Sequence, residues 1–471
     1  MTATRTQPTA APRSLFHTPD TVTFLTLYLV VLWAIPSNRS VPALGSAGSA
    51  AVLWGVMALV LWCYFLLQRT KPELARRANP VRIAQFVLIA AVFASYVAAM
   101  TRAIPAAEIN PADTGLIRIA GWAGILLIAA DGITDLSRLL TLARRIVFGG
   151  TALAALGVAQ FFTGQSFVDL IVIPGLSVGD SYASVEMRGG LVRSAGTSSH
   201  PLEYGMALST ILPIAITLAL REKNRAFIVR WLPVGLIVLG LVLSGSRSSI
   251  IGLLVGVAVL VPTWSRREAI TLGAAAIGFV GVTYVVAPRV INNFRYLFIS
   301  AGDDPSSDSR TGSLGIVAEF FARAPFFGRG FGTFLPQYQI LDNQYLLLVL
   351  EVGIVGAVAF LGVCLTAVLS SIVAARRVPR EQLPLERSMG FALAGSVLAG
   401  TVLLALFDGL SFPQAAGSLF LMLGLSAAYW RISHTDVVEA GVAPAAVPPA
   451  EHEEAAQAAQ AAEAQQHGED A

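Results

Sequence analysis

Residues 48–68 read GSAAVLWGVMALVLWCYFLLQ, a run without a single charged side chain. Roughly 20 apolar residues suffice for a helix to cross the hydrocarbon core of a bilayer. Arg69 and Lys71 follow directly, as is typical of the cytoplasmic side of a membrane helix. This stretch therefore predicts that the chain folds as helices within a membrane.

Similar apolar runs recur along most of the chain and predict an all-α, polytopic membrane protein of about twelve transmembrane helices. The composition agrees, because 55% of the 471 residues are hydrophobic and 13% are charged, whereas soluble domains carry about 25% charged residues. The spans are expected near 21–36, 48–68, 83–101, 115–130, 146–163, 202–220, 226–243, 249–263, 270–287, 344–370, 389–407 and 412–430.

The loop charges predict the orientation. Suppose that residues 1–20 form a cytoplasmic tail. Every loop on the cytoplasmic side is then basic, and these inside segments together hold most of the 32 Lys and Arg residues. We therefore expect a multi-pass protein of the cell inner (cytoplasmic) membrane with both termini cytoplasmic. Residues 21–430 form the membrane domain, and the tail 431–471, rich in Ala, Glu, Gln and Pro, is expected to be disordered or transiently helical.

Two long loops, 164–201 and 288–343, fall on the outer face. A cluster of arginines on that face runs against the positive-inside tendency and indicates an anionic ligand: Arg188, Arg193, Arg247, Arg289, Arg295, Arg310, Arg323 and Arg329. The second loop also predicts a helix at 309–324, capped by Asp308 or Ser309 and ended by Pro325. Its apolar residues share one face, so we expect it to lie in the lipid headgroups; a lid over a lipid substrate is the alternative.

The first motif is 193–204, RSAGTSSHPLEY. Ser198 or Ser199 suits the N-cap of the next helix, and Pro201 its first turn. A well-built helix start explains the serines and the proline. It does not explain Arg193, His200 and Glu203 at one membrane boundary, where ionisable groups are usually functional.

The second motif is the polar turn 244–249, SGSRSS. A helix begins here, and helix N-termini attract anions. Arg247 adds a planar donor fork that matches a phosphate. The alternative is a hairpin whose Arg extends to the membrane surface.

The third motif runs from PFFGRGFG at 325–332 to DNQYL at 342–346. No strand precedes Gly328 and Gly330, so they do not form a dinucleotide fingerprint, and we expect them to permit sharp turns. Asp342 is either an ordinary N-cap or a catalytic carboxylate. Asp408, beside another helix start, is expected to pair with an outer arginine. If the three helix starts converge, they and the arginines form a diphosphate-binding site.

Four motifs within about 185–360 resemble those of the O-antigen ligase and polymerase family. They are the Arg-x-x-Gly…His-Pro helix entry, the Ser-Gly-Ser-Arg turn, the Pro-Phe-Phe-Gly-x-Gly loop and the Asn-x-Tyr-Leu helix start. The resemblance implies an integral-membrane glycosyltransferase that takes a glycan from a polyprenyl diphosphate carrier on the outer leaflet and transfers it to a growing chain or lipid acceptor. It implies no metal and no cofactor. Nothing suggests nucleic acid as a partner, and whether a flippase and a chain-length regulator assist stays open.

By this resemblance Arg193 and Arg247 bind the leaving diphosphate, and Arg310 and Arg188 join them as outer-loop arginines. Family ligases usually carry a His before the Asn, where this chain has Asp342. The general base is therefore Asp342 or His200, with Glu203 as a third catalytic candidate, and a polymerase is favoured over a lipopolysaccharide ligase. Supporting roles fall to Asn343, Tyr345, Gly328, Gly330 and Asp408.

Three other expectations follow from the sequence. Transferases that use polyprenyl monophosphate sugars resemble one another in having paired acidic residues in the first outer loop. Residues 37–48 contain no acidic residue, which argues against this class.

A transporter of anions or lipid-linked glycans is the main alternative, although transporters place ionisable groups near the bilayer midplane. Cys63 and Cys364 lie in apolar runs, so neither a disulfide nor a thiolate metal site is expected.

Overall fold

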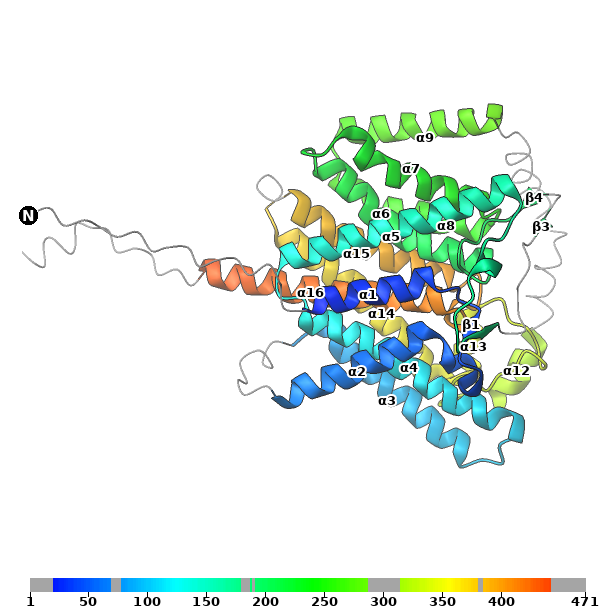
Figure 1. Cartoon of the computed structure of the whole chain (residues 1–471). Coiled ribbons are helices and arrows are strands. Elements are labelled where there is room, and N and C mark those ends of the chain that lie inside the picture. The colour runs from blue at the N-terminus through cyan, green and yellow to red at the C-terminus, as the bar shows by residue number, and fades with distance from the viewer. Residues whose placement is uncertain are drawn as a thin grey trace, which may run out of the picture.

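The computed structural model describes residues 20–68, 78–178, 187–188, 191–286, 314–379 and 384–441. Within these residues the chain is almost entirely helical, and each of the twelve predicted spans overlaps an α-helix, the tenth overlapping two (Figure 1). The helices are α1 Thr21–Ala34, α2 Ala50–Gln68, α3 Pro80–Met100, α4 Ala106–Gly132, α5 Leu136–Thr163, α6 Pro201–Arg221, α7 Phe227–Leu243, α8 Arg247–Ala258, α9 Arg266–Val286, α12 Leu314–Arg323, α13 Gln344–Glu351, α14 Gly353–Arg377, α15 Pro384–Leu403 and α16 Pro413–Gly441.

Eight of the described helices are long and apolar enough to cross a membrane, namely α2, α3, α4, α5, α6, α9, α14 and α16. Three shorter apolar segments, Thr21–Ala34, Phe227–Leu243 and Arg247–Thr263, add to them. The last joins α8 to the 3₁₀ turn η4, Val261–Thr263. The chain is therefore a multi-pass membrane protein, and twelve crossings remain a prediction.

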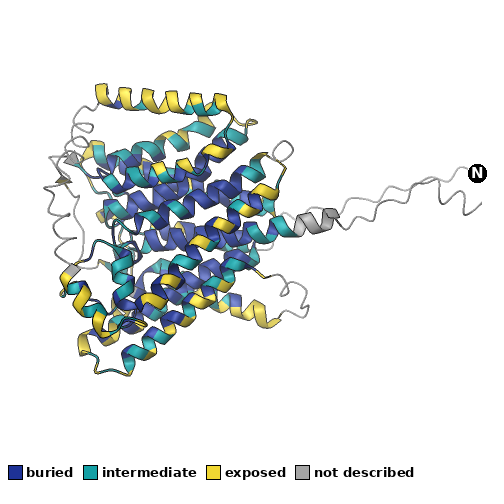
Figure 2. Ribbon diagram, turned by 180° about the vertical axis from the view of Figure 1, so that it is seen from behind, coloured by how far each residue is buried: buried dark blue, intermediate teal, exposed yellow. Residues whose placement is uncertain are grey.

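The helices run side by side, and burial separates a centre from a periphery (Figure 2). Of the most apolar stretch of each helix, 94% is buried in α6 and 89% in α16, whereas only 6% is buried in α9. Helices α4 and α2 approach closely through small residues, because a Cβ on Gly55 would lie 2.3 Å from the Gly121 carbonyl oxygen. The central helices position the motifs, while α9 lies along one edge of the bundle (Figure 1).

Two short antiparallel ribbons accompany the helices, and the sequence did not predict them. Strand β1 (Arg39–Ser40) pairs with β2 (Ser177–Val178), and β3 (Met187–Arg188) pairs with β4 (Leu191–Val192). The 3₁₀ turns η1 (Pro42–Gly48), η3 (Val168–Leu170) and η5 (Gly409–Ser411) complete the described elements. Two-residue strands carry too little alternation to show in a sequence pattern.

The predicted tenth span is two helices, so its prediction as one continuous helix is wrong. The break falls between α13 and α14, where Gly353 has φ 68°. A Cβ at Gly353 would lie 2.2 Å from the Phe326 carbonyl oxygen, and Ile354 N donates to the Pro325 carbonyl at 2.9 Å. The loop at 325–332 thus displaces the helix backbone where only glycine fits.

Other boundaries also differ. Helix α4 begins at Ala106 rather than 115, and α5 begins at Leu136, where Asp135 accepts from Arg138 N at 3.0 Å. Helix α16 continues to Gly441, into the segment predicted as a tail. Residues 1–19 and 442–471 lie outside the described residues, and the division into tails and membrane domain stays a prediction.

Helix α12 ends before Pro325 as predicted, but its apolar face packs on protein. Val317 is buried with Phe334, Leu341 and Leu350, and Ile316, Phe320 and Phe321 pack against this cluster. This face therefore contacts protein and not lipid, and whether the helix lies at the depth of the headgroups stays a prediction. The predicted caps Asp308 and Ser309 lie outside the described residues.

We call the end of the bundle at which α6, α8 and α13 begin the motif end, and the other the tail end, where α16 leaves the bundle (Figure 1). Many arginines at the tail end form ion pairs between segments, among them Arg82–Asp131 at 3.0 Å and Arg144–Glu222 at 2.7 Å.

Candidate functional site at the motif end

Helix α6 begins at His200. This residue has extended backbone angles (φ −146°, ψ 145°), and its Nδ1 accepts from Leu202 N at 3.1 Å. The predicted caps Ser198 and Ser199 are therefore wrong, whereas Pro201 occupies the first turn as predicted. The His200 ring packs against Phe412, with centroids 5.9 Å apart. His200 thus joins the start of α6 to the segment before α16.

Glu203 lies one turn into α6 and is fully buried. Its Oε2 accepts from Ser37 Oγ at 2.7 Å, from Ser199 N at 2.8 Å and from Ser199 Oγ at 3.0 Å. Its Oε1 accepts from Gln414 N at 2.7 Å. One carboxylate therefore joins the segment after α1, the approach to α6 and the first turn of α16.

The first two motifs contact each other. Arg193 is buried, and its Nε donates to the Ser244 carbonyl at 3.1 Å. Gly245 has φ 61°, and a Cβ there would lie 3.4 Å from Arg193 Cγ. Arg247 is the first residue of α8, two positions beyond that glycine. Residues more than 50 positions apart in sequence thus form one basic corner at the motif end.

The starts of α6 and α8 lie against each other. A Cβ on Gly205 would lie 2.0 Å from Ser249 Oγ, so glycine is required for this approach. Ser244 Oγ lies 3.0 Å from Ser249 Oγ, and Ser246 Oγ lies 2.6 Å from Ser248 Oγ. The N-terminal ends of the buried helix α6 and the half-buried helix α8, with their partial positive charges, therefore converge beside Arg193 and Arg247.

The glycines of the third motif serve close backbone packing, and the predicted sharp turns are confirmed. Gly328 and Gly330 have φ 67° and 109°. A Cβ at Gly328 would lie 2.4 Å from the Glu351 carbonyl oxygen. Arg329 N donates to the Leu350 carbonyl at 3.1 Å, and Gly330 N to the Glu351 carbonyl at 2.8 Å. The loop is thereby fixed against the end of α13.

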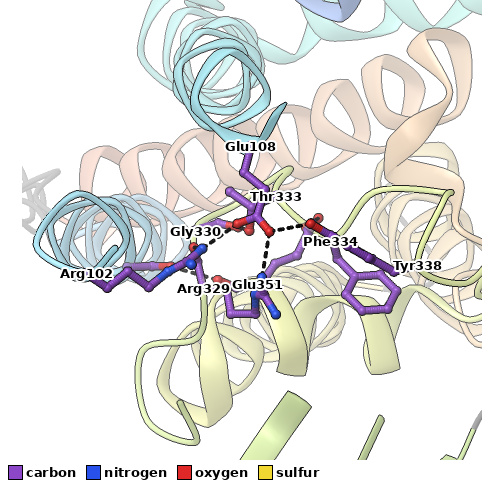
Figure 3. A network of polar contacts seen from close by, with 9 residues as sticks. Arg102, Glu108, Arg329, Gly330, Thr333, Phe334, Tyr338 and Glu351 are labelled. Atoms are coloured by element: carbon purple, nitrogen blue, oxygen red, sulfur yellow. Dashed lines mark hydrogen bonds and ion pairs between the residues drawn. The ribbon is translucent and has the colours of Figure 1, made fainter. Parts of the chain in front are cut away.

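A buried carboxylate that the sequence did not single out fixes the same loop from the other side (Figure 3). Glu108 of α4 is fully buried and lies 2.6 Å from Arg329 and 2.5 Å from Arg102. Tyr338 Oη donates to Glu108 at 2.7 Å, which raises the pKa of Tyr338. The one available signal was that Arg102 and Glu108 both lie in the predicted outer loop between the spans 83–101 and 115–130. The partner, 221 residues away, could not be inferred from it.

Helix α13 is capped by Asn343, not by Asp342. Asn343 Oδ1 accepts from Tyr345 N at 2.9 Å and from Leu346 N at 3.2 Å. The interpretation of Asp342 as the N-cap is therefore wrong. Its side chain, half-buried, is not used in the cap.

The start of α13 docks on the end of α15. Gln344 N donates to the Leu404 carbonyl at 2.9 Å, and Gln344 Oε1 accepts from Leu410 N at 2.8 Å. Tyr345 Oη donates to the Thr401 carbonyl at 2.6 Å. Because η5 also contacts α6, η5 connects the start of α13 to α6, the helix of the first motif.

Asp408 lies between α15 and η5, near Asp342. Burial raises the pKa of Asp408 to about 6, and the charge of Asp342 adds to the rise, while Arg118 opposes it. Arg118 comes from α4, donates to the Leu410 carbonyl and stacks 5.1 Å from the Trp122 ring centroid. The cation acting on Asp408 is thus an arginine absent from the predicted cluster.

The remaining candidates are placed only in part. Arg310 lies outside the described residues, and Arg188 is described as part of β3 without its side chain. Cys63 and Cys364 are both unpaired. Within the described ranges, no group of three or more His, Cys, Asp or Glu side chains is placed to hold a metal ion.

Comparison with known proteins agrees with the second and third motifs. Residues 232–361, from α7 into α14, match the model of a family described as O-antigen ligase. The matched region contains Arg247, the glycine loop and Asp342, whereas Arg193, His200 and Asp408 lie outside it. No curated protein matches the chain. We conclude that the chain is a multi-pass membrane protein in which residues 232–361 match an O-antigen ligase domain, and that such a domain implies glycan polymerase or ligase activity.

Proposed function

We propose that the protein is a glycan polymerase of the exopolysaccharide or capsule type. It transfers a polyprenyl-diphosphate-linked oligosaccharide to a growing polysaccharide, or to a lipid acceptor, on the outer face of the cytoplasmic membrane. The basic loops that join the spans at the tail end support a cytoplasmic tail end, so the motif end faces outward.

The observation that carries the proposal is the contact between Arg193 and the Ser244–Arg247 turn. The backbone of this turn lies against Arg193 at 3.1 Å, and Arg247 opens α8 beside it. Two guanidinium groups and two converging helix N-termini suit the two phosphates of a diphosphate. We place the leaving diphosphate here, with Arg310 and Arg188 as further ligands from the outer loops.

Asp342 is the better candidate for the general base. His200 Nδ1 already accepts a backbone N–H, so in the neutral imidazole Nε2 carries the proton and cannot take another. The Asp342 carboxylate does not take part in the helix cap, because Asn343 caps α13. Glu203, whose two oxygens accept four hydrogen bonds, is assigned a positioning role.

The reaction follows from these assignments. Asp342 takes the proton of the acceptor hydroxyl, whose oxygen bonds to the anomeric carbon of the donor glycan. The bond between that carbon and the diphosphate oxygen breaks, and polyprenyl diphosphate leaves. Arg193 and Arg247 stabilise the negative charge that develops on the leaving group. Arginine supplies this stabilisation without a metal, so transfer is proposed to be metal-independent.

The test is chain growth by the purified protein in lipid nanodiscs, with polyprenyl-diphosphate oligosaccharide from the same organism. We compare wild type, Arg193→Ala and Arg247→Ala, each with and without EDTA. Both variants are expected to lose about 100-fold or more in rate, and EDTA is expected to change nothing. Arg225→Ala, which removes an exposed tail-end arginine, is the matched control and retains the rate.

Two outcomes would contradict the proposal. Folded Arg193→Ala and Arg247→Ala proteins with wild-type rates would remove the diphosphate site. Movement of lipid-linked glycan across liposomes without transfer to any acceptor would establish the transporter instead.

A further inference from the structure

A polar pocket lies at the tail end, far from the motifs. It has a volume of about 180 Å³ and is formed where α6 ends, η4 turns, and α9 and α15 begin. Its lining includes Arg221, Thr263, Ser265, Glu268, Arg387 and Ser388. Two arginines, three hydroxyl groups and one carboxylate leave this lining with a net positive charge. None of these residues takes part in the proposed transfer.

Arg221 is held rigidly in the pocket wall. Its Nε donates to Ser388 Oγ at 3.1 Å, one terminal nitrogen to Glu268 at 2.9 Å, and the other to the Thr263 carbonyl at 2.7 Å. These bonds join three segments and fix the plane of the guanidinium. Because a guanidinium has five N–H groups, two remain beyond these three bonds.

Arg387 faces the same pocket from α15. Its Nη1 lies 3.1 Å from the Val378 carbonyl and 3.3 Å from the Arg376 carbonyl, at the end of α14. Its other nitrogens have no hydrogen-bond partner among the described residues, and the side chain is half-buried. Arg387 thus combines a fixed position with available donors.

The surroundings favour a lipid as the source of the anion. Helix α9 begins at the pocket, and its apolar residues face outward, with Ile270 62% and Ile277 77% exposed. A helix so little buried in a membrane protein is bounded by lipid. The pocket therefore lies where this lipid-facing helix meets the polar boundary, the depth at which phospholipid phosphates occur.

We propose that this pocket binds the phosphate of an anionic phospholipid headgroup in the leaflet at the tail end. Arg221 and Arg387 contact the phosphate oxygens, and the hydroxyls of Ser265 and Ser388, which among the described residues only accept hydrogen bonds, donate to it or to the headgroup. Basic pockets between transmembrane helices bind such headgroups. The acyl chains lie along α9.

The test is native mass spectrometry of the full chain in neutral detergent, titrated with phosphatidylglycerol, phosphatidylcholine or inorganic phosphate. Wild type is expected to retain phosphatidylglycerol in preference to phosphatidylcholine. Arg387→Gln is expected to bind phosphatidylglycerol about fivefold more weakly. Arg267→Gln, which removes an exposed arginine at the same end outside the pocket lining, is the matched control and binds as wild type does.

Glu268→Gln separates binding from folding, because its expected effect has the opposite sign. Glutamine keeps an oxygen for the cap at Ser265 N, but removes the negative charge beside Arg221. Phosphatidylglycerol is therefore expected to bind about fivefold more tightly. Equal retention by wild type, Arg387→Gln and Glu268→Gln would overturn the site. If the two substitutions change the affinity for inorganic phosphate, and the protein shows no preference for phosphatidylglycerol over phosphatidylcholine, the ligand is free phosphate and the lipid proposal is overturned.

Discussion

Two carboxylates stand near helix starts at the motif end, and their surroundings differ. Glu203, at the start of α6, is fully buried and accepts four hydrogen bonds from three segments. Asp342, before α13, is half-buried, and the adjacent Asn343 makes the cap. The start of α6 is held together by a side chain. The start of α13 is held by the Asn343 cap and by Gln344 and Tyr345, which bond to the end of α15 and to η5, so Asp342 is not needed to hold it.

The difference indicates which carboxylate is available for chemistry. A buried carboxylate that already accepts four hydrogen bonds stabilises the fold, and taking a proton would weaken that arrangement. A carboxylate positioned by its neighbours keeps its own acceptor sites. Substitution should therefore cost stability at Glu203 and activity at Asp342.

The largest effect on stability is expected for Glu203→Ala. It leaves the N–H groups of Ser199 and Gln414 and the Ser37 hydroxyl without their buried acceptor, at a cost of roughly 3–5 kcal/mol in the free energy of unfolding. Chemical unfolding in nanodiscs measures it. Glu319→Ala, which removes an exposed partner of Arg323, should change stability by less than about 0.5 kcal/mol. Equal stability of the two variants would remove the distinction between the regions.

The next largest effect is expected for Gly328→Ala, in the loop beside α13. A Cβ there would meet the Glu351 carbonyl oxygen at 2.4 Å, at φ 67°, so the loop must shift at a cost of about 2–3 kcal/mol. Gly362→Ala in α14 is the control. Its Cβ meets nothing within 4 Å, and alanine favours helix by up to about 1 kcal/mol. Unfolding midpoints compare the two, and an undestabilised Gly328→Ala would show that the backbone contact is dispensable.

A smaller, pH-dependent effect is expected at Asp408, beside Asp342. Burial raises its pKa in the folded protein to about 6, from the usual 3.8. The folded state therefore binds the proton more tightly. The resulting stability is fully present below the usual pKa and lost as the pH rises through about 6. The wild type should lose roughly 1 kcal/mol between pH 5 and pH 8.

Asp408→Asn mimics the protonated carboxyl and should lack this loss. Unfolding midpoints at pH 5 and pH 8 measure the difference for both proteins. Parallel pH dependences for wild type and variant would mean that Asp408 is not held in a buried position beside Asp342.

The sequence predicted the helices better than the connections between them. Apolar runs located the helices, because hydropathy is a local property of the chain. They did not reveal the break at Gly353, which results from the loop at 325–332 packing on a helix that is near only in space. The β1–β2 ribbon likewise pairs Arg39 with Val178, two residues that no local pattern connects.

The sequence singled out several residues of the motif end as candidates, but it did not reveal the contacts between them. Arg193, Arg247 and Gly245 stood out as residue types, and the structure brings them together. The helix N-caps were assigned to the wrong residues. Asp342 and its neighbour Asn343 are both residue types that favour the N-cap, and only the backbone angles decide which of them caps the helix. Glu108, Arg102 and Arg118 were missed because their partners lie far away in sequence.

The most direct test is the rate of glycan chain growth per folded molecule for Asp342→Asn and Glu203→Gln, measured side by side in nanodiscs with unfolding curves. Asp342→Asn should lose about 100-fold or more in rate while its stability changes by less than about 0.5 kcal/mol. Glu203→Gln should lose stability, yet keep its rate within about tenfold of wild type once corrected for folded protein. A wild-type rate in Asp342→Asn, or an inactive but stably folded Glu203→Gln, would contradict the account.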